Sequence, residues 1–275
     1  MMEERLLHEV VGSVLVLTLN RRTKLNAVDH ELSALVAAAL DDAEADPRIG
    51  AVCLTGAGQR AFCAGGDLGS MATRGTPPTG PASTGFAGVV SHPISKPLVA
   101  AVNGLARGGG VEIVLACDLA VASSGATFGM PEAGHGLVAG AGGLLRLPAQ
   151  VPAKFASFLL LTGDVIDAET ALRWGLVNEV TRPEECLERA VHLAQRVAAL
   201  PRQAVADTRA IVRGGAAWSS SPERLAENDA AMWRGIRSPE AQALTAGYAA
   251  RAASAEPSAP VGEGSADGRR PSPAS

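Results

Sequence analysis

Two glycine-rich turns in the sequence present main-chain amides where a substrate can reach them. The first, TGAGQRAFCAGGDL, spans residues 55–68 and follows the apolar run AVCL. The second, NGLARGGGVE, spans residues 103–112 and precedes an apolar helix expected to begin at Gly108. The first amides of a helix lack partners within it and carry partial positive charge, and glycine lets a ligand approach the backbone closely. Two such turns can together polarise a carbonyl oxygen and stabilise an enolate, at about 3 kcal/mol per donor.

Two glutamates near these turns suit acid–base chemistry. Glu112 lies two residues after the triple glycine, and Glu132 lies in TFGMPEAGHG, directly after Pro131. A pair of carboxylates can hold one water molecule, deprotonate it and return a proton to a neighbouring carbon, which contributes about 100- to 10,000-fold in rate. Taken one at a time, Glu112 is also explained as a partner of the helix dipole, and Glu132 as a surface carboxylate of a loop.

The first turn also fits part of a dinucleotide-binding motif. Residues 56–61, GAGQRA, have the spacing GxGxxA, which in a Rossmann unit binds a pyrophosphate. The pair Gly65-Gly66 is costly inside the helix that such a unit requires at this point. An NAD-dependent dehydrogenase therefore remains an alternative that rests on this spacing alone. Asp67 is interpreted as a residue that caps the turn, and His135 as a structural or solvated side chain.

The elements that must position these turns alternate between strands and helices. Residues 9–19 have the composition of a strand, and Asp29 is the expected N-cap of a helix that ends before Pro47. Further short apolar runs predict strands at residues 49–54, 97–102 and 118–122. This alternation is typical of an α/β fold.

The chain beyond about Gly140 is predominantly helical in pattern. The expected helices are AKFASFLLL, DAETALRW, PEECLERAVHLAQRVAAL, RQAVADTRAIV and SPERLAENDAAMWRG. Residues 69–88 are rich in Gly, Pro, Ser and Thr and predict a long, mobile connection. Residues 254–275 are of low complexity and predict a disordered tail, because they cannot bury enough apolar surface to offset their chain entropy.

The composition indicates an ordinary soluble enzyme and argues against several other classes. The chain has 275 residues, a net charge of -4 and 3% aromatic residues, so nucleic acid is not an expected partner. It has no apolar run of about 18 residues and no export signal, so neither a membrane nor secretion is expected. The four cysteines lack paired spacing and are interpreted as reduced, which predicts a cytoplasmic location. The histidines show no metal-ligand spacing, so we expect no metal.

Motifs spread over about residues 9–250 are similar to those of one known family. They are NRRTKLNAV, AFCAGGDL, KPLVAAVNG, ARGGGVEIVLACDLAVAS, FGMPEAGHGLVAGAGGLLRLP and LTGDVIDAETALRWGLVNEV. With these motifs the sequence resembles the enoyl-CoA hydratases of the crotonase superfamily. It departs from the family pattern at Arg22, where many relatives have proline, and at Arg107, where relatives usually have an uncharged residue.

The resemblance implies an architecture and an assembly. The α/β fold would be a ββα superhelix, or spiral, over residues 1–200, followed by a helical trimerisation region at 201–253 and the tail at 254–275. The expected assembly is a homotrimer or a dimer of trimers. The expected substrate is an acyl-CoA thioester, with coenzyme A entering as part of the substrate and no separate cofactor.

The resemblance also implies roles for particular residues. The amides of Gly66 and Gly109 would bind the thioester oxygen, while Glu112 and Glu132 would handle water and proton in the syn hydration of a 2-enoyl-CoA. The amide of Gly140 would help to hold the water.

Further contacts follow from the same likeness. Residues of the loop 64–68 would lie along the pantetheine of coenzyme A, and they include Ala64, Gly66, Asp67 and Leu68.

Other functions remain open at the level of sequence. Members of the superfamily include carnitinyl-CoA-type dehydratases, double-bond isomerases and pathway-specific lyases, and the phrases LRWGLVN and GGLLRLP are similar to the carnitinyl-CoA dehydratase branch. Two glutamates favour water chemistry, because an isomerase can work with one. A noncatalytic binding protein of the same fold is a further alternative, although the acidic balance and the few aromatic residues argue against RNA.

Overall fold

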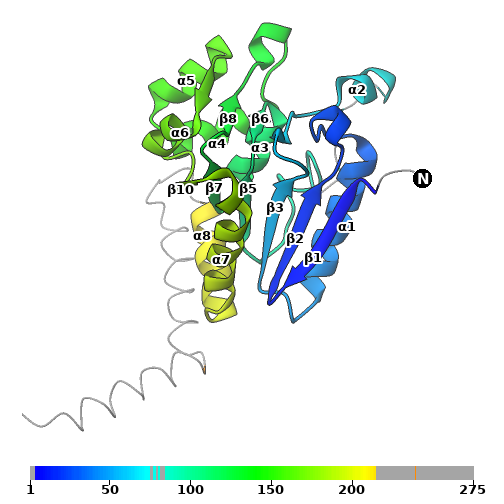
Figure 1. Cartoon of the computed structure of the whole chain (residues 1–275), viewed down its shortest axis with the longest axis vertical. Helices are drawn as coiled ribbons and strands as arrows, with labels where there is room; N and C mark the ends of the chain where they lie inside the picture. The colour runs from blue at the N-terminus through cyan, green and yellow to red at the C-terminus, as the bar shows by residue number, and fades with distance from the viewer. Residues whose placement is uncertain (1–3, 75–76, 79, 81–83, 215–238, 240–275) are drawn as a thin grey trace, which may run out of the picture. The chain divides into compact units, whose positions relative to one another are not determined.

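Six strands form the larger of two β-sheets (Figure 1). The computed structural model describes residues 4–74, 77–78, 80, 84–214 and 239. In spatial order the strands of this sheet are β1 (Leu6–Val11), β2 (Val14–Leu19), β3 (Ala51–Gly56), β5 (Leu98–Val102), β7 (Leu119–Ser123) and β10 (Glu179–Thr181). The pair β1–β2 is antiparallel and every other pair is parallel. The carboxyl ends of β3, β5 and β7 therefore meet at one edge of the sheet.

The chain reverses direction within the segment predicted as a single strand at residues 9–19. Gly12 adopts a left-handed conformation with φ of 64°, and β1 and β2 pair on either side of it. The prediction of one strand was therefore wrong. Its physical reason is that glycine takes a positive φ at little cost, which allows a tight hairpin between two apolar segments.

Three strands of the smaller sheet each follow directly, along the chain, a strand of the larger sheet. Its order is β4 (Ala61–Cys63), β6 (Leu105–Arg107), β8 (Thr127–Gly129) and β9 (Val165–Asp167). Along the chain β3 and β4 lead to α2 (Leu68–Arg74), β5 and β6 lead to α3 (Gly109–Ala116), and β7 and β8 lead to α4 (Gly143–Gln150). This repeated order is the expected ββα superhelix, and the predicted α/β class is confirmed.

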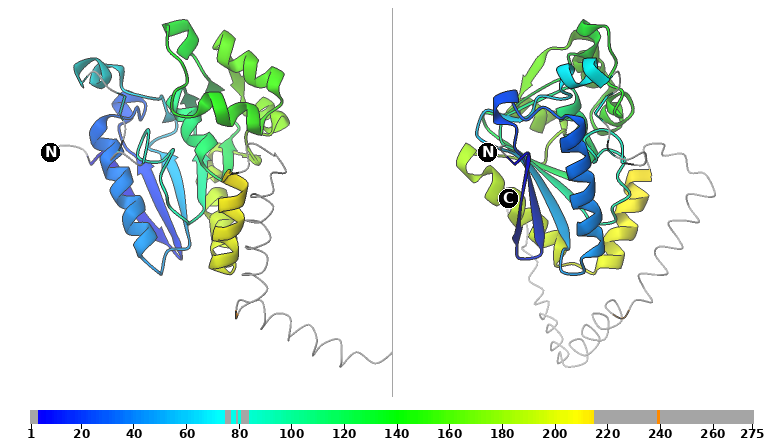
Figure 2. Two further views of the ribbon diagram at one scale, coloured as in Figure 1. Left: turned by 180° about the vertical axis from the view of Figure 1, so that it is seen from behind. Right: turned by 90° about the vertical axis from the view of Figure 1, so that its right-hand side faces the viewer.

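The larger sheet is covered on both faces because successive residues of its strands point in opposite directions. Leu15, Leu17 and Leu19 of β2 belong to the core cluster that contains one side of α1 (His30–Ala45). Val14 and Val16 belong to the cluster of α7 (Cys186–Ala198). The two helices lie on opposite faces of the sheet, as Figure 2 shows in its right-hand view. Each buried aliphatic side chain contributes about 1.5–3 kcal/mol, so the sheet is a firm base for the turns at its edge.

Helix α1 begins and ends as the sequence predicts. The side chain of Asp29 accepts a hydrogen bond from the amide of Leu32, and the helix ends two residues before Pro47. The remaining elements are α5 (Ala153–Thr162), α6 (Ala168–Trp174), α8 (Arg202–Gly214), η1 (Arg22–Lys24), η2 (Glu132–His135) and η3 (Pro183–Glu185). Within the described ranges, no helix is both long and apolar enough to cross a lipid bilayer.

The long connection predicted at residues 69–88 begins with a helix. Helix α2 covers residues 68–74, so the expectation of an irregular connection was wrong for this part. Asp67 caps α2, since its side chain accepts the amide of Ser70 and its carbonyl accepts the amide of Met71. The last predicted helix, SPERLAENDAAMWRG, and the tail at 254–275 lie outside the described residues, and the boundaries at residues 200 and 253 stay predictions.

Candidate active site

The two glycine-rich turns lie against each other beyond the carboxyl ends of β3 and β5. An ideal Cβ built on Gly65 would lie 3.3 Å from the amide nitrogen of Gly109. Ideal Cβ atoms on Gly66 and Gly109 would lie 3.6 and 3.2 Å from the same atom, Cε2 of Phe86. The structure therefore brings the two predicted amide donors together at one place, beside the ring of Phe86.

The backbone pairing of the two turns uses neither amide. Val28 pairs with the backbone on either side of Gly66: its amide donates to the carbonyl of Gly65 (2.8 Å), and its carbonyl accepts the amide of Asp67 (2.7 Å). The amide of Gly66 between them faces the other way. Gly109 is the first residue of α3, so its amide has no acceptor within the helix. Among the described residues, neither amide has a hydrogen-bond partner.

Glu112 lies in the first turn of α3 and is buried, with 4% of its surface exposed. Its Oε1 accepts the amide of Gly143, the first residue of α4, at 2.8 Å. Burial raises the pKa of this carboxyl group, the bond from Gly143 opposes that effect, and the nearby charge of Glu132 raises the pKa further. Glu112 is therefore a fixed carboxyl group with a pKa above its ordinary value.

Glu132 opens the turn η2 and lies against Gly108. An ideal Cβ on Gly108 would lie 2.8 Å from Oε1 of Glu132, so only glycine leaves room there. The other oxygen, Oε2, is buried and has no hydrogen-bond partner among the described residues. Burial raises the pKa of Glu132, because an unpaired buried carboxyl group favours its neutral form.

The start of α3 thus gathers all four groups predicted for chemistry. Gly108 contacts the carboxyl group of Glu132, its carbonyl accepts the amide of Glu112 at 3.1 Å, and Gly109 follows it directly. Unpaired amides beside two carboxyl groups of raised pKa form a site that can stabilise an oxyanion while protons move next to it.

The first half of the turn at residues 55–61 is occupied by the protein itself. The amide of Gly56 donates to Oδ1 of Asn103 (3.0 Å), and the amide of Ala57 donates to the carbonyl of Leu19 (2.8 Å). Asn103 in turn donates to the carbonyls of Gly56 and Gly58. Because these amides are taken, the spacing GxGxxA does not form a pyrophosphate site here, and the geometry argues against the dehydrogenase alternative.

An arginine holds the loop at residues 64–68 in place through a hydrogen bond. Asp67 accepts a hydrogen bond from Arg21 at 2.8 Å, and this bond lowers the pKa of Asp67. The amide of Ala64 donates to the carbonyl of Leu25 at 3.0 Å, while the side chain of Leu68 is 63% exposed. Asp67 thus orders the turn, as its interpretation as a capping residue requires.

Gly140 and His135 occupy the exposed segment that leads from η2 into α4. His135 contacts the carbonyl of Pro131 through Nδ1 at 2.9 Å, which fits its interpretation as a structural side chain. Gly140 stands three residues before Gly143, whose amide binds Glu112. The part of the chain that the structure describes contains no group of three His, Cys, Asp or Glu side chains that could hold a metal ion.

Three contributors to the site have no local signal in the sequence. They are Phe86, Gly143 and Arg146, which contact the glycine turns, Glu112 and the turn before α4, respectively. Phe86 is the only aromatic residue in the Gly- and Pro-rich stretch from 69 to 88, which was the one available hint.

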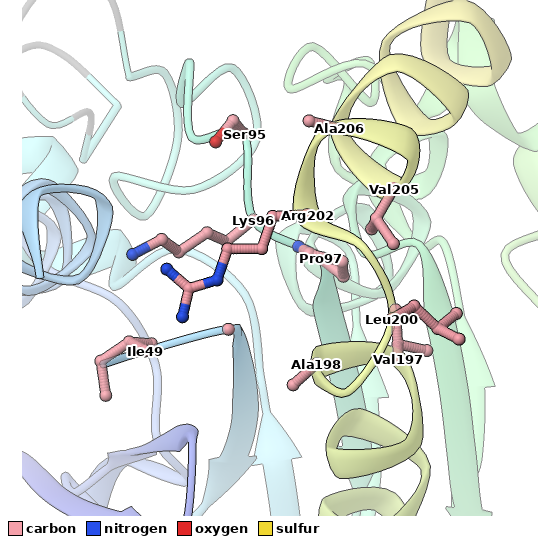
Figure 3. Close-up of a pocket in the computed structure, with 11 residues that line it drawn as sticks. Ile49, Ser95, Lys96, Pro97, Val197, Ala198, Leu200, Arg202, Val205 and Ala206 are labelled. Atoms are coloured by element: carbon pink, nitrogen blue, oxygen red, sulfur yellow. The ribbon is translucent and has the colours of Figure 1, made fainter. Parts of the chain in front are cut away.

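A small crevice of about 60 Å³ lies elsewhere in the fold (Figure 3). It is lined by Gly50 and Pro97, which immediately precede β3 and β5, and by Leu200 and Val205 around the start of α8. Because the strands are parallel, this crevice is at the opposite end of the sheet from the glycine turns. It therefore takes no part in the candidate site.

Comparison with known proteins assigns the family. The family model described as enoyl-CoA hydratase/isomerase matches residues 9–247. The chain belongs to the enoyl-CoA hydratase/isomerase family. Carnitinyl-CoA dehydratase of Proteus mirabilis is 39% identical over 203 residues, which are 74% of this chain and 77% of that protein.

Solved structures of family members agree with this assignment. An enoyl-CoA hydratase from Mycobacterium tuberculosis H37Rv superposes with a TM-score of 0.82 at 37% identity, over 90% of this chain and 97% of that one. A carnitinyl-CoA dehydratase from Mycobacterium avium 104 gives a TM-score of 0.74 at 40% identity, over 87% and 95% of the two chains. The resemblance to the crotonase superfamily is confirmed, and the protein is an enzyme of the hydratase and dehydratase type that acts on acyl-CoA thioesters.

The contact between Gly109 and Phe86 predicts the effect of a small substitution. In Gly109→Ala the new Cβ would overlap the ring of Phe86, so we expect a loss of about 1–3 kcal/mol in the free energy of unfolding. Phe86→Leu in the same chain should recover part of it, measured by urea unfolding of the single and double variants. Gly66→Ala is the control, since the tightest contact of its Cβ is the flexible end of Met71 at 3.1 Å, and its distance of 3.6 Å to Phe86 is an ordinary contact. Equal losses in both alanine variants would contradict this packing.

The hydrogen bonds of Asn103 predict a structural cost. Asn103→Ala removes partners of the Gly56 amide and of two carbonyls, so the free energy of unfolding should fall by about 1–3 kcal/mol. Asn103→Asp keeps the acceptor for Gly56 but sets a carboxylate oxygen against the two carbonyls, so it should lose at least as much. Urea unfolding monitored by circular dichroism measures both changes. A cost below about 0.5 kcal/mol for Asn103→Ala would contradict the role given to this side chain.

Proposed function

We propose that the protein catalyses the reversible syn addition of water to a 2-enoyl-CoA, which gives a 3-hydroxyacyl-CoA. The observation that carries this proposal is the convergence of two amides without a partner among the described residues, at Gly66 and Gly109, with the buried carboxyl group of Glu112 and the half-buried one of Glu132. Hydration of a conjugated thioester needs these parts, because negative charge develops on the thioester oxygen while water loses one proton and the α-carbon gains another.

The chemical steps can be assigned to named atoms. The amides of Gly66 and Gly109 hold the thioester oxygen, and the carboxylate of Glu112 takes a proton from the water that attacks the β-carbon. Glu132 gives its proton to the α-carbon as the enolate collapses. The proton left on Glu112 then returns to Glu132 through solvent, so the cycle consumes one water and one double bond.

The environments of the two glutamates support this division of roles. Glu112 accepts the amide of Gly143, which stabilises its charged form. Glu132 has a buried oxygen without a partner among the described residues, which stabilises its neutral form. Two carboxyl groups held in different environments are suited to act as base and acid in one reaction.

The remaining predicted contacts belong to the same proposal. Ala64, Asp67 and Leu68 border the oxyanion turn and would follow the pantetheine of coenzyme A, and the amide of Gly140 would help to hold the water. Coenzyme A enters with the substrate and no further cofactor takes part. A homotrimer or dimer of trimers, assembled through residues 201–253 and located in the cytoplasm, completes the proposal.

Dehydration of a 3-hydroxyacyl-CoA is the second candidate for the physiological direction. It is favoured by the names of the curated relatives, which are carnitinyl-CoA dehydratases. The same residues run this reaction in reverse, with Glu132 removing the α-proton and Glu112 protonating the departing hydroxide. Chromatography with mass analysis of the products from a panel of enoyl- and hydroxyacyl-CoAs shows which acyl groups are hydrated or dehydrated. The retention time reveals an isomerase, whose product keeps the mass of its substrate, and a different product mass reveals another lyase.

The glutamate roles predict a large effect on turnover. In Glu112→Gln and Glu132→Gln we expect kcat for crotonyl-CoA to fall by about 100- to 10,000-fold, because each variant lacks one proton transfer. The loss of absorbance of the conjugated thioester measures the rate. Glu188→Gln, an exposed glutamate of α7, is the control and should keep its activity. A wild-type rate in either site variant refutes these roles.

The oxyanion role of Gly66 has a test of its own. Gly66→Pro removes the amide, which no structural hydrogen bond uses, so kcat should fall by about 100- to 1,000-fold while the fold persists. Gly66→Ala keeps the amide and should retain most of the activity. The kinetics are paired with thermal unfolding of each variant. Full turnover by a correctly folded proline variant would remove Gly66 from the mechanism.

A further inference from the structure

Arg146 of α4 is a partly buried guanidinium group close to Glu112. The structure records no carboxylate within ion-pair distance of it among the described residues. Burial lowers the pKa of Arg146, and the nearby charge of Glu112 opposes this effect. In return, the positive charge of Arg146 opposes the burial that raises the pKa of Glu112. A charged group buried without an ion-pair partner is costly, so its retention here calls for a function.

The guanidinium group joins two backbone segments of the site. Its Nη1 donates to the carbonyl of Ala141 at 3.0 Å, and its Nη2 donates to the carbonyl of Val90 at 2.5 Å. It lies over Gly142, where φ is 104° and an added Cβ would overlap Nη1. Glycine at position 142 is therefore required for the turn at residues 139–143, and it leaves the space in which the arginine folds back onto the turn.

Each of the two segments leads to a different part of the proposed chemistry. The turn at residues 139–143 ends at Gly143, whose amide donates to Glu112 at 2.8 Å. Val90 donates through its own amide to the carbonyl of Phe86, whose ring lies beside Gly66 and Gly109. Arg146 is therefore hydrogen-bonded to both segments. One of them carries the amide that binds Glu112, and the other leads to the ring beside Gly66 and Gly109.

The charges around the two glutamates differ in sign and number. Glu112 faces Glu132 of η2 and Arg146 of α4, and it accepts the amide of Gly143. Glu132 faces the imidazole of His135, and its Oε2 has no partner in the described part of the chain. A guanidinium group and a main-chain amide therefore act on Glu112, whereas Oε2 of Glu132 is buried without a partner among the described residues. This difference favours a charged Glu112 and a neutral Glu132.

We propose that Arg146 is a positioning residue for the water-activating base: it holds the turn at residues 139–143 against Glu112 and keeps this carboxyl group ionised beside Glu132. This proposal rests on the function proposed above, to which it adds the source of the asymmetry between the two carboxyl groups. Arg146 contacts neither the thioester oxygen nor the reacting carbons in this scheme. It acts through Glu112 and through the peptide groups that surround it.

The kinetic test compares two substitutions of Arg146 over a range of pH. Arg146→Met removes the charge and keeps an apolar stem, while Arg146→Lys keeps the charge but not the paired donors. Without the cation the pKa of Glu112 rises, so the ascending limb of kcat/KM against pH should move to higher pH in the methionine variant. At the acidic end of the range kcat/KM should fall by about tenfold or more, and lysine should restore most of the wild-type limb.

Thermal unfolding gives a readout that does not depend on activity. A glutamate whose pKa is raised by folding binds more protons in the native state. It therefore makes the protein less stable as pH rises from its unfolded-state pKa to its folded-state pKa. In Arg146→Met the folded-state pKa of Glu112 lies further above its unfolded-state value. Tm should therefore fall more steeply between pH 5 and pH 8 than in the wild type. The additional slope should vanish in the double variant Glu112→Gln/Arg146→Met, which has no titrating group at position 112.

A matched control and two outcomes decide the proposal. Arg173→Met removes an exposed arginine of α6 and should change neither the pH profile nor the slope of Tm. Equal losses in the methionine and lysine variants, with an unmoved limb and no additional slope of Tm, would show a purely structural arginine and overturn the proposal. An inactive wild type would refute the hydratase function alone, because the unfolding measurements would still show whether Arg146 keeps Glu112 charged.

Discussion

The candidate site depends on one constraint, which is the placement of a buried and a half-buried carboxyl group beside amides that have no partner among the described residues. Burial raises the pKa of both Glu112 and Glu132, and the charge of Glu132 raises the pKa of Glu112 further. Such an arrangement reduces stability and persists only where the surrounding structure over-determines it. The buried sheet below the turns, the glycine at position 108 and the amide of Gly143 provide that support.

The ββα superhelix explains how residues far apart in the sequence meet at this place. Each repeat ends with a turn beyond the larger sheet, so the turns after β4 and β6 become neighbours and the turn after β8 brings Glu132 to them. The third repeat also starts α4, whose first amide binds Glu112. The candidate site is thus built from the turns of repeated units, while helices pack on both faces of the sheet below them.

The sequence was sufficient for the features that are local. Gly66, Gly109, Glu112 and Glu132 have motifs of their own, and Asp29 and Pro47 set the limits of α1 by capping and by the missing amide. The hairpin at Gly12 and the helix α2 were missed because a glycine can turn a strand or sit in a capped helix with the same local pattern. Phe86 and Arg146 could not be placed at all, since their partners lie tens of residues away and only the folded chain brings them together.

The central claim is that two amides and two carboxyl groups act together on one conjugated thioester. The most direct measurement is the mass of the product formed from crotonyl-CoA in a mixture of heavy-oxygen water and deuterium oxide. The account predicts a 3-hydroxyacyl-CoA with one solvent oxygen on the β-carbon and one solvent hydrogen on the α-carbon. A product that has gained no oxygen would contradict it. A failure to convert crotonyl-CoA and every longer and branched analogue would contradict it as well.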